Sequence, residues 1–269
     1  MSLKKNKEND NFYPVSIPEV GWNCDYLWST NRGCPFNCNY CSSKRLNKRF
    51  KVMGDPTAPK RLKGEWTLFP NSDNECLKRF ILPNAGVFIS PYNDIMSIPE
   101  EDIRSILYKI YDSSEYWFDR DSIGHNEKSQ FKVIMQTKKP QKYFHYFDLI
   151  PQGSWLGTTI ETDDDQLYHY LNISKAPHLV GRKVTMEQIN KKNFKTFVTI
   201  EPIMKFTKML IWWMQEIKPD LIFIGCDTGK NNLPEPSRNE LIELIEQLKK
   251  ITTVHVKKNA QCILSDLLI

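Results

Sequence analysis

The stretch Gly33-Cys34-Pro35-Phe36-Asn37-Cys38-Asn39-Tyr40-Cys41 brings three cysteines together within eight residues. Thiolates are soft ligands that favour zinc, copper and iron–sulfur clusters, so this spacing indicates a metal site. A four-iron cluster usually has four cysteine ligands. With three clustered cysteines, one iron would keep an open position, and an open position is where a reactive ligand binds in catalytic metal sites.

A structural zinc knuckle is the alternative interpretation, because three thiolates and a fourth ligand also suit tetrahedral zinc. Such a knuckle pairs two short Cys-x2-Cys hairpins, and this sequence has one. The other cysteines, Cys24, Cys76, Cys226 and Cys262, are scattered singly. The odd total of seven cysteines argues against a disulfide framework. The sequence therefore favours an iron–sulfur cluster over zinc.

The length of 269 residues and the hydrophobic content of 40% are enough for one sizeable α/β domain. We expect residues 1–21 to form a disordered, lysine-rich tail and residues 22–269 to form the domain. No apolar run approaches the roughly 20 residues needed to cross a bilayer, so we expect a cytoplasmic protein without a membrane partner. The net charge of +5 favours an anionic partner only weakly.

Short apolar or β-branched runs alternate with helical patterns, which is typical of β/α units around a parallel sheet. The predicted strands are Tyr26–Ser29, Gly86–Ser90, Phe131–Gln136, Trp155–Ile160, Thr196–Ile200 and Leu221–Ile224, with Thr253–Val256 as a possible seventh. The predicted helices are Pro99–Ser114, Gln141–Leu149, Asp163–Leu171, Met209–Ile217 and Arg238–Lys250, the last with Ser237 as its cap.

This pattern predicts an incomplete (β/α)6 barrel, shorter than the closed barrel of about 250 residues and eight repeats. In such folds the site lies at the carboxyl ends of the strands. The first predicted strand leads into the cysteine loop, and polar residues follow each of the others.

The cysteine spacing, with the aromatic Tyr40 before the last cysteine, resembles the signature of the radical S-adenosylmethionine (SAM) superfamily. Further motifs are similar to those of the phage Gp37/Gp68 family of that superfamily, whose function is unknown. They are Gln136-Thr137-Lys138-Lys139-Pro140, Trp155-Leu156-Gly157-Thr158-Thr159-Ile160-Glu161, Ile200-Glu201-Pro202 and Ile224-Gly225-Cys226-Asp227-Thr228-Gly229. Cys226-Asp227 departs from the family pattern, where a glycine and a glutamate are expected.

The resemblance implies a [4Fe–4S] cluster held by Cys34, Cys38 and Cys41, with SAM chelating the open iron. It also implies reductive cleavage of SAM to methionine and a 5′-deoxyadenosyl radical, and an electron donor such as flavodoxin or ferredoxin. The candidate SAM contacts are Tyr40 against the adenine, Ser90 and Asp94 for the amino group, Thr137 and Lys138 for the carboxylate, and Glu161 and Glu201 for the ribose hydroxyls. Each of these polar residues also suits an ordinary salt bridge or cap at a barrel rim.

Cys226 is a candidate hydrogen-atom donor, as a cysteine is in spore photoproduct lyase, a related radical SAM family. The alternative interpretation of Cys226 is a small buried hydrophobic residue.

Basic residues follow the cysteine loop: Lys44, Arg45, Lys48, Arg49, Lys51, Lys60, Arg61 and Lys63. They suit a phosphate backbone or a solvated helix face. Trp28, Trp66, Phe69 and Tyr92 suit either base stacking or core packing.

Three functions stay open at this point. An enzyme that modifies a nucleobase in DNA or RNA is favoured by the phage-type resemblance, the basic stretch and the laterally open mouth of an incomplete barrel. The second is a radical SAM enzyme acting on a small metabolite or peptide. The third is a non-catalytic, metal-stapled nucleic-acid-binding protein, which would bind SAM without consuming it.

Overall fold

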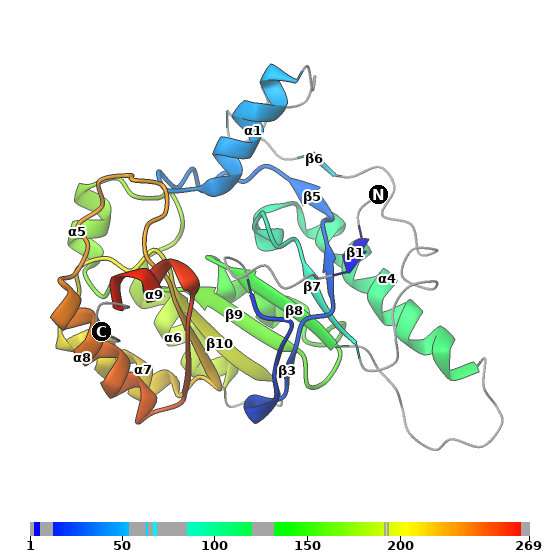
Figure 1. Ribbon diagram of the computed structural model, residues 1–269. Helices are drawn as coiled ribbons and strands as arrows, with labels where there is room; N and C mark the ends of the chain where they lie inside the picture. The colour runs from blue at the N-terminus through cyan, green and yellow to red at the C-terminus, as the bar shows by residue number, and fades with distance from the viewer. Residues whose placement is uncertain are drawn as a thin grey trace.

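The computed structural model describes residues 3–5, 13–53, 63, 67–68, 85–119, 132–190, 192 and 194–264. Its centre is an eight-stranded sheet in the order β1-β4-β7-β8-β9-β10-β11-β12 (Figure 1). The strands are β1 Leu3–Lys5, β4 Tyr26–Trp28, β7 Gly86–Ile89, β8 Lys132–Thr137, β9 Trp155–Thr159, β10 Lys195–Ile200, β11 Leu221–Ile224 and β12 Thr253–Val256. The seven strands from β4 to β12 are parallel, and only β1 pairs antiparallel, along the edge of β4.

The six predicted strands and the possible seventh are therefore all present, within one or two residues of their predicted ends. The apolar runs of β7, β9 and β11 are buried on both faces, as expected for parallel strands between two packed layers, while the edge strand β12 is partly buried. One edge is β12 and the other is β1, so the barrel is open. The prediction of an incomplete parallel β/α barrel is confirmed.

Helices cover the outer face of the sheet. They are α4 Glu100–Asp119, α6 Leu179–Ile189, α7 Lys208–Ile217 and α8 Arg238–Lys249, while α5 Asp165–Tyr170 lies at the rim. Apolar side chains from α4, α6, α7 and α8 form one core with the outward side chains of the strands, such as Val87, Val133 and Ile222. Ser237 caps α8 in a capping box with Glu240, as the sequence predicts.

Two parts of the helix prediction differ from the structure. The segment expected as a helix over Gln141–Leu149 is a 3-10 helix, η3 Pro140–His145. Tyr143, which is buried, donates from its hydroxyl to the carbonyls of Met135 and Gly157 and so holds this segment against the sheet. Helices α1 Ser42–Val52, α6 and α9 Lys258–Leu264 were not predicted from the apolar pattern.

Residues 13–23 pack inside the barrel, so this part of the segment predicted as a tail over residues 1–21 is folded against the sheet. Tyr13 is 5% exposed and stacks on Phe88 at a centroid distance of 5.0 Å. Trp22, in the small β2–β3 hairpin (Ser16–Ile17 and Trp22–Asn23), contacts the rings of Trp155, Phe197 and Phe223. An open barrel leaves inward aromatic residues uncovered, and the segment from Tyr13 to Asn23 covers them.

The remaining regular elements are short: η1 Pro18–Val20, η2 Ile95–Ser97, and the β5–β6 pair of Asn31–Arg32 with Thr67–Leu68. Across the residues that the structure describes, no helix is both long enough and apolar enough to cross a bilayer.

Candidate active site at the carboxyl ends of the strands

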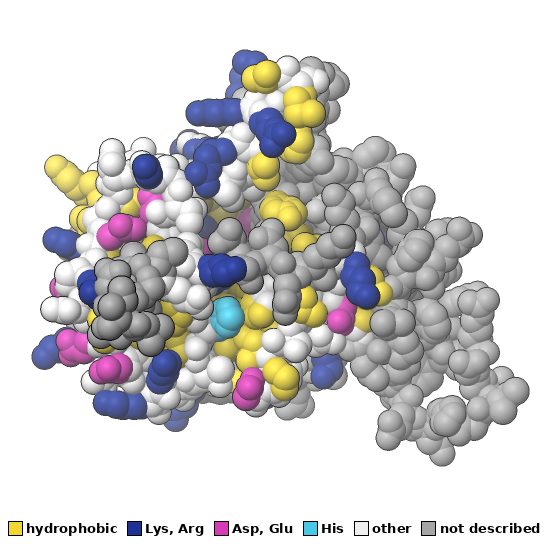
Figure 2. Space-filling model, viewed as in Figure 1, with side chains coloured by type: hydrophobic (Ala, Val, Ile, Leu, Met, Phe, Trp, Pro, Cys, Tyr) yellow, Lys and Arg dark blue, Asp and Glu magenta, His cyan; other side chains and the backbone are white. Residues whose placement is uncertain are grey.

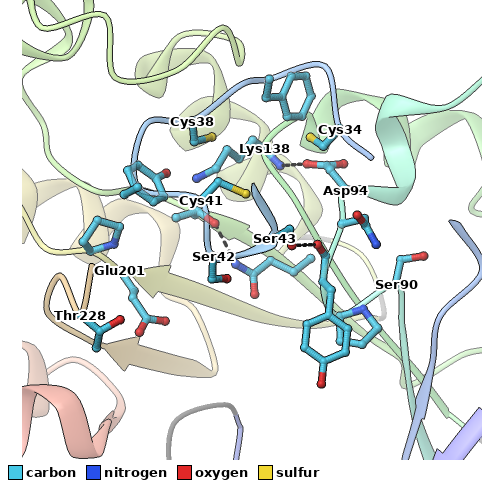
Figure 3. A pocket seen from close by; sticks show the side chains of 18 of the residues that line it. Cys34, Cys38, Cys41, Ser42, Ser43, Ser90, Asp94, Lys138, Glu201 and Thr228 are labelled. Atoms are coloured by element: carbon cyan, nitrogen blue, oxygen red, sulfur yellow. Dashed lines mark hydrogen bonds between the residues drawn. The ribbon is translucent and has the colours of Figure 1, made fainter. Parts of the chain in front are cut away.

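A cavity of about 460 Å³ opens where the parallel strands end. One wall is the cysteine loop, Gly33 to Cys41, which follows β4 and β5 (Figure 3). The other walls come from residues at the ends of the neighbouring strands: Ser90 to Asp94, Gln136 to Lys138, Thr159, Glu201, Pro202, Cys226 to Thr228, Lys257 and Asn259. The volume lies within the range typical of small-molecule sites.

Asn93, which the sequence did not single out, anchors the beginning of the cysteine loop. Its Oδ1 accepts from the backbone N–H of Gly33 at 3.0 Å, and its Nδ2 donates to the carbonyl of Asn31 at 2.7 Å. Gly33 has a φ of 87°, a conformation that other residues adopt only with strain. The loop therefore leaves β5 in a turn that glycine permits and Asn93 holds.

Cys34, Cys38 and Cys41 lie on one side of the cavity with Phe36 and Ala176 packed around them. The Sγ of Cys38 lies 3.1 Å from the Oγ of Ser174. Burial raises the pKa of both Cys34 and Cys38; at Cys38 the nearby Lys138 offsets part of the rise. These thiols therefore favour the protonated form, and a metal ion would have to replace their protons in order to bind.

Glu161 lies beneath this site and is completely buried. Its Oε1 accepts hydrogen bonds from the hydroxyl of Tyr40 and the ammonium group of Lys138, and from Tyr168 at 3.2 Å. Its Oε2 accepts from Nη1 of Arg182 at 3.1 Å. Glu161 is not among the residues that line the cavity; it binds Tyr40 and Lys138, and its predicted contact with ribose hydroxyls stays a prediction.

Two cations decide the ionisation of this carboxylate. Burial alone would raise the pKa of Glu161, but Lys138 and Arg182 outweigh it and bring the pKa below its ordinary value. Burial raises the pKa of Tyr40 well above its ordinary value, so its phenol stays protonated and donates to Glu161. The buried group of Glu161, Lys138 and Arg182 thus contains one carboxylate and two cations, and it carries one excess positive charge next to the cavity.

Asp94, at the end of β7, lines the cavity and is tied by three donors. Its oxygens accept from Met96 N at 3.0 Å, Thr137 Oγ1 at 2.6 Å and Lys138 N at 2.7 Å. Thr137 Oγ1 donates its hydrogen to Asp94 and accepts from Lys139 N at 2.9 Å, and its predicted contact with a SAM carboxylate stays a prediction. Ser90 lies nearby and bonds Asn31 Oδ1 at 2.7 Å.

The side of the cavity opposite the cysteine loop is built around Glu201. Its oxygens accept from Lys257 Nζ at 2.6 Å and Asn259 Nδ2 at 2.8 Å. The ammonium group of Lys257 also lies 4.1 Å from the ring centroid of Tyr13. A Cβ on Gly225 would lie 2.5 Å from Glu201 Oε1, so glycine at this position makes room for the carboxylate. Glu201 lines the cavity, as the ribose assignment requires.

Cys226 comes two residues after the end of β11 and lines the same cavity. Tyr92 is half-exposed at the rim and also lines the cavity. Trp28 is different: its side chain is fully buried in the outer core, which agrees with the core-packing alternative and leaves no surface for a base. Trp66 and Phe69 lie outside the described residues.

Helix α1 carries the basic residues that follow the cysteine loop and projects above the barrel mouth (Figures 1 and 2). Arg45, Lys48, Arg49 and Lys51 are exposed, and the helix contains no acidic residue. Lys44 is half-buried and donates to the carbonyl of Asn37 at 3.1 Å, so it stabilises the cysteine loop locally. Lys60 and Arg61 lie outside the described residues.

No protein-family model and no curated protein matches this sequence. Solved structures do match. Spore photoproduct lyase with bound AdoMet and dinucleoside spore photoproduct is 11% identical with a TM-score of 0.56, over 87% of this chain and 76% of that chain. The fold is the open β/α barrel of the radical SAM type.

Two further structures are similar. Spore photoproduct lyase complexed with dinucleoside spore photoproduct has a TM-score of 0.55 and 11% identity over 93% of this chain and 80% of that chain. SuiB of Streptococcus suis bound to S-adenosylmethionine has a TM-score of 0.52 and 10% identity over 86% of this chain, and this chain spans 49% of SuiB. At these identities the likeness establishes a shared fold, and the resemblance to the phage family stays a prediction.

Sequence reasoning missed Arg182, Asn93 and Tyr13. Arg182 comes from α6, whose buried face is mixed with polar residues such as Lys183 and Thr185 and therefore has no clear apolar stripe. Tyr13 lies in a polar N-terminal segment with no strand or helix pattern. Lys257 was visible as a strand-end residue, but its partner Glu201 is 56 residues away in the chain.

Proposed function

We propose that this chain is a radical SAM enzyme in which Cys34, Cys38 and Cys41 bind a [4Fe–4S] cluster and SAM binds in the adjoining cavity. The observation that carries this proposal is the set of three thiols from one loop, in the wall of a cavity that also contains Asp94, Lys138 and Glu201 at the carboxyl ends of the strands. A fold shared with chains crystallised with AdoMet or S-adenosylmethionine supports it.

The residues present fit such a cluster. Three thiols match a cluster that keeps one iron for a ligand other than cysteine. Their burial disfavours free thiolates in the absence of a cation, and the excess positive charge of the Lys138–Glu161–Arg182 group suits a net negative cluster with thiolate ligands. When bound, the cluster supplies the electron that cleaves the SAM sulfonium to methionine and a 5′-deoxyadenosyl radical.

The side chains of the cavity would bind and orient SAM. Asp94 would accept from the amino group, with Ser90 beside it, and Lys138 would donate to the carboxylate with the ammonium hydrogens that Glu161 leaves available. Tyr40 would contact the adenine. Glu201, which lines the cavity, is the stronger candidate for the ribose hydroxyls because Glu161 is enclosed beneath Tyr40.

The favoured substrate is a nucleobase in DNA or RNA. Helix α1 offers exposed cations at the mouth, and phosphate contacts of this kind position a nucleic acid without reading its sequence. The similarly folded spore photoproduct lyase was crystallised with a dinucleoside spore photoproduct. Cys226 lines the cavity and is our candidate for the hydrogen-atom donor to a substrate radical.

Anaerobic reconstitution tests the cofactor proposal. We expect about four irons per chain, and formation of 5′-deoxyadenosine from SAM after reduction. Cys38→Ala should lose the cluster and the SAM cleavage, whereas Cys24→Ala, which alters a buried cysteine inside the barrel, should keep both. Stoichiometric zinc without iron, or SAM cleavage by Cys38→Ala, would overturn the proposal in favour of a zinc knuckle.

Turnover assays test the substrate proposal separately. We expect single-stranded or duplex nucleic acid to bind at low salt and to increase 5′-deoxyadenosine formation. An increase with a small-molecule extract and none with nucleic acid would assign the enzyme to metabolites or peptides. Binding of nucleic acid with SAM left intact would instead favour a non-catalytic binding protein.

A further inference from the structure

Asp165, His169 and His178 form a second group of metal-ligating side chains, outside the cavity. Asp165 and His169 are four residues apart in α5 and therefore lie on one face of the helix. His178 immediately precedes α6. One ligand atom from each residue lies within 4.8 Å of the other two.

The distances between these atoms match a metal site. Four ligands at zinc–nitrogen distances of 2.0–2.1 Å in a tetrahedron lie about 3.4 Å from one another. Here Nε2 of His169 lies 2.9 Å from Nδ1 of His178, and Nδ1 of His178 lies 3.6 Å from Oδ2 of Asp165. A shift of a few tenths of an ångström would bring both pairs to that spacing.

The backbone orients the carboxylate for this arrangement. Oδ1 of Asp165 accepts from the backbone N–H of Leu179 at 2.9 Å, and Oδ2 accepts from Val180 N at 3.5 Å while lying 3.6 Å from Nδ1 of His178. Such hydrogen bonds behind a ligand fix its orientation in metal sites. The His178 side chain is 70% exposed, which leaves a coordination position open to water.

We propose that Asp165, His169 and His178 bind one divalent cation of the zinc class. Two imidazoles and one carboxylate are ligands that zinc accepts, with water as the fourth. The site is independent of the proposed SAM chemistry, because none of its three residues lines the cavity.

The cation would stabilise the loop that supports the cysteines. Between the two histidines, the carbonyl of Ile173 accepts from Asn39 N at 3.0 Å, and Lys175 N donates to the carbonyl of Phe36 at 2.6 Å. Ser174 contacts the Sγ of Cys38. A metal bound to His169 and His178 ties both ends of this loop together and so holds it against the cysteine loop.

Zinc titration of the cluster-loaded protein, with iron and zinc quantified separately, tests this site. We expect one zinc per chain, and His169→Ala and His178→Ala should each weaken zinc binding by at least about tenfold, since even changes behind a ligand cost 10- to 100-fold. Asp165→Asn should also weaken it while keeping the stronger hydrogen bond from Leu179 N to Oδ1; only the longer bond of 3.5 Å from Val180 N to Oδ2 is lost. His145→Ala, another exposed histidine, should have no effect.

Two further measurements separate this site from the cysteines. A variant with Cys34, Cys38 and Cys41 all changed to Ala should still bind zinc, and zinc should slow hydrogen exchange over residues 171–178 in the wild type but not in His178→Ala. The absence of zinc binding, equal affinity in the histidine variants, or loss of zinc with the cysteines would overturn the proposal and leave a hydrogen-bonded histidine pair.

Discussion

Nη1 of Arg182 lies 3.1 Å from Oε2 of Glu161, and neither side chain is exposed to solvent. Arg182 comes from α6 and Glu161 follows β9, so the pair joins the helical layer to the carboxyl end of the sheet. Lys138 and Tyr40 bind the other oxygen of the same carboxylate. The pair therefore supports the two side chains that face the proposed SAM site.

Removing Arg182 should destabilise the protein strongly. Arg182→Met leaves Glu161 buried with one cation fewer, and breaking a buried ion pair costs about 3–5 kcal/mol. Urea denaturation measures the change. Lys195→Met, which removes the more exposed pair with Asp220, is the control and should cost at most about 1 kcal/mol. Similar costs for the two variants would contradict a structural role for the buried pair.

The stability that Glu161 contributes should disappear in acid. Because its folded-state pKa is depressed, the contribution is complete above the unfolded pKa and is lost as the pH falls through the folded pKa. We expect the difference in unfolding free energy between wild type and Glu161→Gln to be constant at neutral pH and to shrink below pH 4.5, the ordinary value. Denaturation midpoints measured at stepwise pH provide the check, and a difference that widens in acid would contradict the sign.

Gly225→Ala should displace Glu201. The added Cβ would lie 2.5 Å from Oε1 and 2.7 Å from Cδ of Glu201, so the carboxylate must move away from Lys257 and Asn259. Overpacking of this kind costs about 1–3 kcal/mol, and we also expect weaker SAM binding in calorimetry. Gly181→Ala is the control, since its Cβ meets only the amide end of Gln141 at 3.1 Å. Unchanged SAM affinity in Gly225→Ala would remove Glu201 from the SAM site.

Charge reversal on α1 should change the salt dependence of nucleic-acid binding. In duplex DNA each lost phosphate contact reduces the slope of log K against log salt by about 0.9. We expect Arg45→Glu, Lys48→Glu and Arg49→Glu together to flatten this slope. The matched triple Lys192→Glu, Lys218→Glu and Lys249→Glu makes the same change in net charge at the other end of the sheet, where these residues precede β10, β11 and β12, and should leave the slope unchanged. Equal slopes in the two triple variants would mean that the basic residues of α1 contact water and not phosphates.

Cys226→Ala should separate radical formation from its use. The residue follows β11 and is not one of the three proposed cluster ligands, so we expect the variant to retain iron and to cleave SAM reductively. If Cys226 donates a hydrogen atom, the product distribution with the nucleic-acid substrate should change, as mass spectrometry of the digested product would reveal. Normal turnover with the wild-type product would remove this role.

The parallel strands and the cysteine loop could be predicted from local pattern alone. Leu221–Ile224 and Thr253–Val256 are short apolar or β-branched runs, and such runs form strands of an α/β sheet; the first is buried and the second, at the sheet edge, is partly buried. The spacing of Cys34, Cys38 and Cys41 fixes three thiols on one short loop. The capping box of Ser237 and Glu240 is also local, because its partners are three residues apart.

The tertiary structure alone decided which polar residues meet. Arg182 and Glu161 are 21 residues apart, Lys257 and Glu201 are 56 apart, and Tyr13 reaches Thr199 across 186 residues of chain. Trp28 and Tyr92 are both aromatic residues near strand ends, yet one is enclosed by the outer core and the other lines the cavity. Local periodicity specifies which face of its own helix or strand a residue prefers. The ion pairs, the packing of the N-terminal segment inside the barrel and the histidine cluster depend instead on how separate elements pack together.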